Sequence, residues 1–181
     1  DGHGGLSAGA SSRLLYDYLE PARSEILDYL YKPNFGASLT MCKVEIGGDA
    51  QSTNGAEASH MHTRMDLNFD RGYEYWLIAE AKRRNPKVTT YGLSWAAPGW
   101  INNGSQWDVF AGRPSCPSPA HCAYFSADNI KYQTNWVIGA KQSYNITVDY
   151  LGIWNERPWG TPAYVKALRA SLDAAGFHST Q

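Results

Sequence analysis

The chain has 181 residues, the length of one domain or of part of one. Its 16 Lys and Arg residues nearly balance 17 Asp and Glu residues, for a net charge of −1, and no run of like charges occurs, so nucleic acid is not an expected partner. No apolar stretch reaches the roughly 18 residues of a membrane-spanning helix. Aromatic residues make up 13% of the chain, which fits either ordinary packing or a cleft that stacks rings on sugars or lipids.

Helix-like and strand-like patterns alternate along the chain. Pro21 suits the first turn of a helix, Ser126 and Thr161 are good N-cap residues, and Asn85-Pro86 is a typical helix end. Short apolar runs between these signals favour strands. The predicted elements are an interrupted amphipathic helix over 14–31, a strand over 37–46, a helix over 70–84, a strand over 87–93, a helix over 126–144, a strand over 148–154 and a helix over 161–176.

This alternation favours an α/β fold in which crossover helices connect parallel strands. The predicted loops after the strands are long, polar and aromatic, as in a TIM (β/α)8 barrel, whose site lies at the carboxyl ends of the strands. Three predicted strands and a fourth expected to end at Asp1 make roughly the first half of such a barrel. We therefore expect residues 1–181 to form one incomplete barrel domain. A doubly wound open sheet is the alternative, although no G-x-G-x-x-G or P-loop motif follows a strand.

The strongest chemical signal is Trp154-Asn155-Glu156, at the end of the last predicted strand. A carboxyl group that is buried there among aromatic rings is expected to have a raised pKa and to hold a proton near neutral pH, as a general acid must. The amide of Asn155 is able to donate a hydrogen bond to a sugar hydroxyl. The pattern predicts acid catalysis on a glycoside, with Glu156 as the acid.

The cysteines and histidines do not form a metal motif. Cys116 and Cys122 lie six apart in a Pro-rich loop, where a small disulfide is feasible, and Cys42 is predicted to be a buried thiol. Zinc at Cys116, His121 and Cys122, or a metal at the lone pair His60 and His62, lacks further ligands at the usual spacing, so no metal and no cofactor is expected.

Two sequons favour the secretory route. They are Asn103-Gly104-Ser105 and Asn145-Ile146-Thr147, one in a loop and one just after a predicted helix, where both are expected to be exposed. Residues 1–5 do not show the pattern of a signal peptide, so any targeting segment is expected outside these residues.

Seven stretches carry a resemblance to a known family. They are Asp1 to Leu15 (DGHGGLSAGASSRLL), Ile26 to Ala37 (ILDYLYKPNFGA), Lys43 to Asp49 (KVEIGGD), Ser59 to His62 (SHMH), Arg71 to Trp76 (RGYEYW), Gly92 to Trp100 (GLSWAAPGW) and Tyr150 to Arg157 (YLGIWNER). In their order and spacing they resemble the galactocerebrosidase family, glycoside hydrolase family 59. They span nearly the whole chain, so the resemblance is far more specific than any single motif.

The resemblance implies a TIM barrel with added β-rich domains and a retaining β-galactosidase acting on galactosylceramide and related galactosyl-sphingolipids, lysosomal or secreted. It implies Glu156 as the general acid/base and Asn155, Trp95 and Thr53 as galactose contacts. It also leaves room for a lipid-presenting activator protein as a partner.

Two features depart from the family pattern. His3 stands where the family tends to have an apolar residue, and residues 111–123 resemble an insertion. A retaining mechanism also needs a second carboxylate, which the family supplies from a later strand, so the nucleophile is expected beyond Gln181. Glu45, near a strand end, is a substitute only if it lines the barrel mouth, and an internal ion pair with Lys43 is the alternative. Another sugar specificity, or a sugar-binding fragment without turnover, remains an alternative function.

Overall fold

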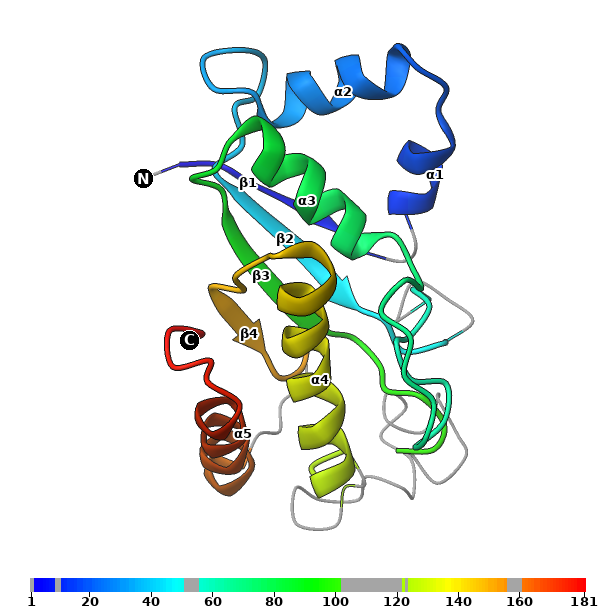
Figure 1. Cartoon of the computed structure of the whole chain (residues 1–181), viewed down its shortest axis with the longest axis vertical. Helices are drawn as coiled ribbons and strands as arrows, with labels where there is room; N and C mark the ends of the chain where they lie inside the picture. Colours follow the sequence, from blue (N-terminus) through cyan, green and yellow to red (C-terminus); the bar gives the residue numbers. More distant parts are fainter. Residues whose placement is uncertain (1, 9–10, 51–55, 102–121, 123, 156–160) are drawn as a thin grey trace.

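The computed structural model describes residues 2–8, 11–50, 56–101, 122, 124–155 and 161–181, in which strands and helices alternate (Figure 1). No helix in these ranges combines the length and the apolar character needed to cross a bilayer. The elements are β1 (Gly4–Ser7), α1 (Ser12–Asp17), α2 (Ala22–Tyr31), β2 (Met41–Ile46), α3 (Glu74–Arg84), β3 (Thr89–Ser94), α4 (Ala127–Tyr144), β4 (Tyr150–Gly152) and α5 (Pro162–Ala174).

The four strands form one parallel sheet in the order β1-β2-β3-β4. Gln181 extends this sheet beyond β4, because its N–H donates to the Asp149 carbonyl (2.8 Å) and its carbonyl accepts from the Leu151 N–H (2.7 Å), the bonding of a parallel pair. The predicted α/β fold with parallel strands and crossover helices is confirmed.

The two faces of the sheet differ in what covers them. Figure 1 shows α3 and α4 crossing one face, and there Cys42, Val44 and Ile46 are completely buried. The other face carries a row of side chains in register across all four strands, Leu6, Lys43, Tyr91 and Tyr150. Leu6 is 56% exposed and Tyr150 is 41% exposed. In a closed barrel this second face is the interior.

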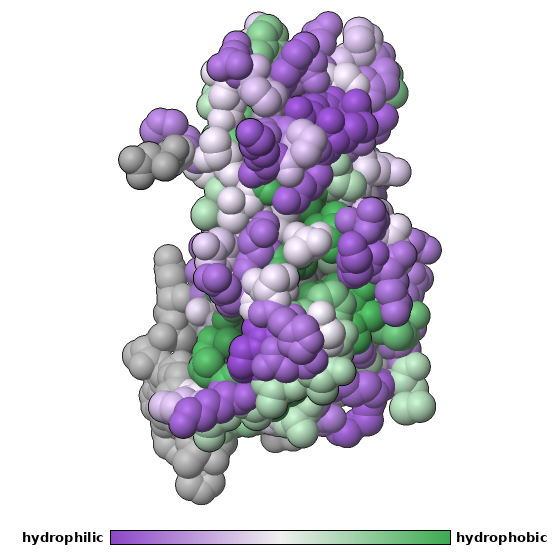
Figure 2. Space-filling model, turned by 60° about the vertical axis from the view of Figure 1, so that its left-hand side comes forward, coloured by the Kyte–Doolittle hydropathy of each residue, from purple (hydrophilic) through white to green (hydrophobic). Residues whose placement is uncertain are grey.

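The hydrophobic core lies between the sheet and the helices. Leu27, Val44, Ile78, Val137 and Leu168 belong to it and come from α2, β2, α3, α4 and α5. Helix α1 adds no apolar side chain that is fully buried. On the face that Figure 2 shows, hydrophilic surface prevails in the upper part and hydrophobic surface reaches the outside lower down.

The predicted helix signals are confirmed. Ser126 Oγ accepts from the Asn129 N–H at 3.3 Å and Thr161 Oγ1 accepts from the Tyr164 N–H at 2.9 Å, which satisfies free donors at the starts of α4 and α5. Lys82, Arg83 and Arg84 lie in the last turn of α3, where the helix dipole favours positive charge.

Several predicted boundaries are wrong. The first strand does not end at Asp1 but spans Gly4–Ser7, because its hydrogen bonds to β2 hold a glycine-rich segment extended. The second strand starts at Met41 instead of residue 37, since Gly36 and Ser38 have positive φ angles, 56° and 47°, in the preceding turn. Helix α3 starts at Glu74 rather than residue 70, and β4 is only Tyr150–Gly152.

Candidate active site

Trp95 and Asn155 are neighbours at the carboxyl ends of β3 and β4. The Asn155 N–H donates to the carbonyl of Ser94 at 2.8 Å, so the residue after β4 is held beside the residue before Trp95. Trp95 is 7% exposed, and Asn155 is half-buried. The structure therefore brings together two of the four predicted site residues. Glu156 and Thr53, the other two, lie outside the described residues.

A buried glutamine ties these two strand ends together. The Gln133 side chain, on α4, is fully buried, and its Nε2 donates to Ser94 Oγ (3.1 Å) and to the Ile153 carbonyl (3.2 Å). Its Oε1 accepts from the hydroxyl of Tyr164, on α5, at 3.1 Å. One side chain thus connects β3, the segment after β4, and two helices. Sequence reasoning missed Gln133, because nothing in a helical glutamine signals such a role.

The ring of Trp154 is packed beside Asn155. It stacks on Tyr124 with the ring centroids 4.3 Å apart and meets Phe125 edge-on at 5.3 Å. The indole N–H of Trp154 is buried without a hydrogen-bond partner in the described part of the chain. This packing fixes Trp154. The backbone of the next residue, Asn155, therefore leaves the sheet in a defined direction.

Lys43 lies on the open face of the sheet, next to Trp95. Its Nζ is 5.2 Å from the ring centroid of Tyr91 and 5.4 Å from that of Trp95, within the range of cation–π attraction. Glu45 is completely buried, and its Oε1 accepts from the Glu57 N–H at 3.1 Å. Lys43 thus packs against the rings of Tyr91 and Trp95. Glu45 lies at the base of the loop after β2, where it binds the N–H of Glu57.

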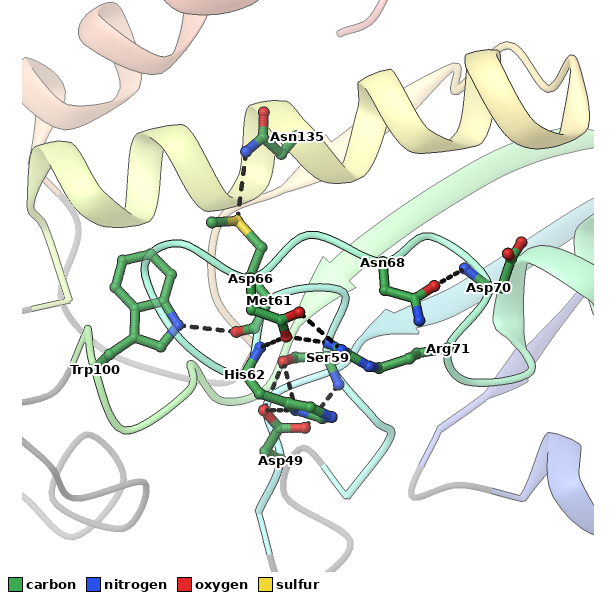
Figure 3. Close-up of polar contacts among 10 residues, drawn as sticks. All are labelled: Asp49, Ser59, Met61, His62, Asp66, Asn68, Asp70, Arg71, Trp100 and Asn135. Carbon is green, nitrogen blue, oxygen red and sulfur yellow. Dashed lines mark hydrogen bonds and ion pairs between the residues drawn. The ribbon is translucent and has the colours of Figure 1, made fainter.

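A polar network shapes the loop after β2 (Figure 3). Asp49, which has a φ of 56°, accepts from the N–H of Ser59 (2.7 Å), from its hydroxyl (2.5 Å) and from His62 Nδ1 (2.8 Å). Asp66 binds Arg71 through both carboxylate oxygens and also accepts from the His62 N–H. These bonds hold both sides of the loop on which the predicted sugar contact Thr53 falls.

His60 is a packing residue. It is 3% exposed, its ring stacks on Tyr132 at 4.3 Å, and its Nε2 bonds to the carbonyl of Tyr132 at 2.9 Å. Burial lowers the pKa of His60 to about 3, so the imidazole is neutral. Among the residues that the structure describes, no three His, Cys, Asp or Glu side chains are grouped as metal ligands.

The cysteines are in two states. Cys42 is a free, buried thiol, as predicted, and burial raises its pKa to about 12. Cys122 is disulfide-bonded. Cys116 lies outside the described residues, so its pairing with Cys122 stays a prediction.

Two further glutamates are buried behind the loop after β2. Glu57 and Glu74 are 2% and 3% exposed and line one small cavity together with Glu45 and His60. Glu57 Oε1 accepts from the Tyr73 N–H, and Glu74 Oε1 accepts from Ser7 Oγ at 3.2 Å. The second oxygen of each carboxyl is buried without a hydrogen-bond partner in the described part of the chain. Sequence reasoning missed this acidic cluster.

Comparison with known proteins identifies the family. The model of glycosyl hydrolase family 59 matches residues 1–181. The chain is 54% identical to galactocerebrosidase of Danio rerio over 178 residues, 98% of this chain and 25% of that protein. It is 49% identical to galactocerebrosidase of Homo sapiens over 177 residues, 97% of this chain and 24% of that protein. The chain therefore spans about a quarter of the length of these relatives.

Solved structures with low sequence identity share the fold. SrfJ from Salmonella typhimurium superposes with a TM-score of 0.72 at 19% identity, over 100% of this chain and 42% of that one. The endo-beta1,6-glucanase BT3312 gives a TM-score of 0.69 at 18% identity, over 100% of this chain and 43% of that one. These neighbours match the predicted partial α/β barrel. From the family match over its whole length, the chain belongs to glycosyl hydrolase family 59.

Proposed function

We propose that this chain is the first part of the catalytic barrel of a retaining β-galactosidase that hydrolyses galactosylceramide and related galactosyl-sphingolipids. The observation that carries the proposal is the family match over residues 1–181, together with galactocerebrosidases that are 49% and 54% identical to the chain. The adjacency of Trp95 and Asn155 at the carboxyl ends of two parallel strands supports it, because barrel enzymes place their sites at that end.

Each proposed site residue has a distinct role. Glu156 donates a proton to the glycosidic oxygen as the ceramide leaves and the nucleophile bonds to the anomeric carbon of galactose. It then takes a proton from the water that displaces the nucleophile from that carbon. The Asn155 amide donates to a hydroxyl of the galactose, a bond that strengthens in the oxocarbenium-like transition state. The Trp95 ring packs on the apolar side of the sugar, and the Thr53 hydroxyl fixes one of its oxygens.

A retaining glycosidase needs a nucleophilic carboxylate about 5–5.5 Å from the acid/base. Glu45 is engaged at the loop base by the N–H of Glu57, which argues against this role for it. We therefore assign the nucleophile to a later strand of the longer protein. The mechanism uses neither a metal nor an organic cofactor.

The proposed compartment is the lysosome or the extracellular space. The disulfide at Cys122 supports it, because disulfides persist in oxidising compartments. A lipid substrate in a membrane is poorly accessible to a barrel mouth, so we include a lipid-presenting activator protein as a proposed partner.

The test compares hydrolysis of a fluorogenic β-galactoside by a protein extended to the length of its relatives, by its Glu156→Gln variant and by the 181-residue chain. We expect turnover by the extended protein, a loss of about 10²–10⁴-fold in the variant, since general acid catalysis has that size, and none by the shorter chain. Full activity of Glu156→Gln would remove the acid/base assignment. Turnover by the 181 residues would place a nucleophile within them.

Two further measurements distinguish the alternative functions. Faster hydrolysis of β-glucosides or β-xylosides than of β-galactosides by the extended protein would indicate another sugar specificity. Galactose binding without hydrolysis of any of these substrates, unchanged in Glu156→Gln, would indicate a sugar-binding protein.

A further inference from the structure

The segment between α4 and β4 presents the sequon Asn145-Ile146-Thr147 in an alternating arrangement. Asn145 and Thr147 are exposed, whereas Ile146 between them is 3% exposed and belongs to the core. The N–H of Ile146 donates to the Ala140 carbonyl at 2.9 Å, and the carbonyl of Thr147 accepts from Thr90 Oγ1 at 2.7 Å. The middle residue thus anchors the segment while both side chains of the acceptor motif point to solvent.

Asn145 ends α4 in the left-handed conformation, with a φ of 52°. Its backbone N–H donates to carbonyls of the last helical turn, and its Oδ1 accepts from Lys141 Nζ at 2.7 Å. Hydrogen bonding through Oδ1 leaves the amide nitrogen Nδ2, the atom that carries an N-linked glycan, without a hydrogen bond in the described part of the chain. The turn therefore presents Asn145 as an exposed residue and holds its side chain in one orientation.

A surface hollow of about 360 Å³, open to solvent, adjoins Asn145. Lys82, Arg83, Pro86 and Tyr144 line it with the sequon itself. Their mixture of an aromatic ring with hydrogen-bond donors suits the acetamido group and hydroxyls of a sugar.

We propose that Asn145 is an N-glycosylation site whose first sugar lies in this hollow. In the modification Nδ2 bonds to the anomeric carbon of a lipid-linked diphospho-oligosaccharide, the bond from that carbon to the diphosphate oxygen breaks with its electron pair, and the amide loses one proton. The glycan lies at the amino ends of β3 and β4, the opposite end from Trp95 and Asn155. It leaves the proposed galactoside site open, and the inference stands whether or not that site is catalytic.

The test secretes the 181-residue chain from cultured eukaryotic cells behind a cleavable leader and maps its peptides by mass spectrometry. Peptide N-glycosidase converts a glycosylated Asn to Asp, so each acceptor is read separately in material from the medium and from the secretory compartments. We expect conversion at Asn145 in most of the unmutated chain. A peptide that carries Asn145 wholly unmodified would overturn the proposal, and this readout requires no variant to fold.

Matched variants identify the acceptor. Thr147→Ala removes the acceptor hydroxyl but keeps Asn145 as the helix end, and we expect loss of the glycan from this peptide, whereas Thr147→Ser keeps it. Asn145→Gln is the second variant, because the longer Gln side chain has no amide nitrogen at the position of Nδ2. Persistence of the glycan mass on this peptide in Thr147→Ala and Asn145→Gln would refute the site. Asn103→Gln leaves the Asn145 peptide unchanged and reports the other sequon.

Discussion

Glu74 combines burial with the charges of two neighbouring carboxylates. Burial raises its pKa well above the ordinary value, and the charges of Glu57 and Glu45 raise it further, against the hydrogen bond from Ser7. Burial also raises the pKa of Glu57. A carboxyl whose folded-state pKa exceeds its unfolded value stabilises the fold most at low pH, and this contribution is lost as pH rises above about 4.5.

His60 changes the pH dependence of stability in the opposite direction. Its folded-state pKa of about 3 lies below the ordinary 6.5, so its contribution to stability is complete above pH 6.5 and is lost as pH falls toward 3. A rise in pH above about 4.5 therefore weakens the contribution of the two glutamates and strengthens that of His60, so the two effects oppose each other.

The first prediction concerns Glu74→Gln. Gln keeps an oxygen that accepts from Ser7 but does not ionise, so the variant is expected to lose part of the decline in unfolding free energy between pH 5 and pH 8. A single group contributes at most about 1.4 kcal/mol per pH unit to that slope. Urea unfolding at several pH values measures it. Glu25→Gln, at an exposed position of α2, is the control, and an equal slope in the unmutated chain and in Glu74→Gln would contradict the prediction.

The second prediction concerns Gln133→Leu. Leu fills a similar volume but leaves Ser94, Tyr164 and the Ile153 carbonyl without the hydrogen bonds that Gln133 makes. Unsatisfied buried groups cost about 1–3 kcal/mol each, so we expect the unfolding free energy to fall by about 2–4 kcal/mol. Chemical denaturation measures the loss. Gln142→Leu, exposed on the same helix, should change the unfolding free energy by less than about 0.5 kcal/mol, and equal losses would argue against the role of Gln133.

At the scale of elements, β3 and α4 approach each other closely at Gly92. A Cβ atom at this position would lie 2.5 Å from the Trp136 ring, so a side chain here forces the helix or the ring to move. Trp136 is 3% exposed and stacks on Tyr75 at 5.2 Å, which leaves the ring little room.

The third prediction follows from this contact. Gly92→Ala should lower the unfolding free energy by about 1–3 kcal/mol through overpacking. Trp136→Leu should lower it too, because it removes ring contacts. The double variant should lose less than the sum, since the smaller side chain makes room for the added methyl group. Denaturant titrations of the four proteins measure the coupling, and strictly additive losses would show that the two side chains do not compete for space.

Helix signals were more informative than strand signals. Ser126 and Thr161 cap their helices as predicted, because a cap depends on residues within one turn of the chain. The first strand, the start of β2 and the length of β4 were misplaced, because a strand ends where its neighbour stops pairing. On α3 the buried side chains include Tyr75 and Ile78, whereas Trp76 between them in the sequence is only half-buried.

At the scale of the whole molecule, β2 and β3 are central and β1 is paired on one side. Within the described residues β1 bonds to β2 alone, whereas β2 and β3 each have two neighbours and β4 is bonded to β3 and to Gln181. An edge strand opens at lower free energy than a central one.

The fourth prediction is therefore a gradient of hydrogen exchange. Amides of Cys42, Val44 and Gly92 should exchange slowest and those of Leu6 and Ser7 much faster in the same molecule. Exchange followed by mass spectrometry or by NMR at one pH checks this order, and protection of β1 equal to that of β2 would contradict it.

Only part of the proposed site was predicted from the sequence. Asn155 was singled out at the end of a predicted strand and Trp95 by the family resemblance, and the structure places their backbones side by side. The glutamine between their strand ends was not predicted, since a buried Gln133 has the same local sequence signature as an exposed glutamine. Assignments of Glu156 and Thr53 stay proposals.

The sequence by itself determined the alternation of helices and strands, the helix caps, the parallel α/β class and the family, because these depend on local preferences and on ordered motifs along nearly the whole chain. The tertiary structure alone decided which glutamates are buried, how Gln133 joins β3 and the segment after β4 to two helices, and that Gly92 must be small. Burial and hydrogen-bond partners are set by residues distant in the chain, and no local pattern encodes them.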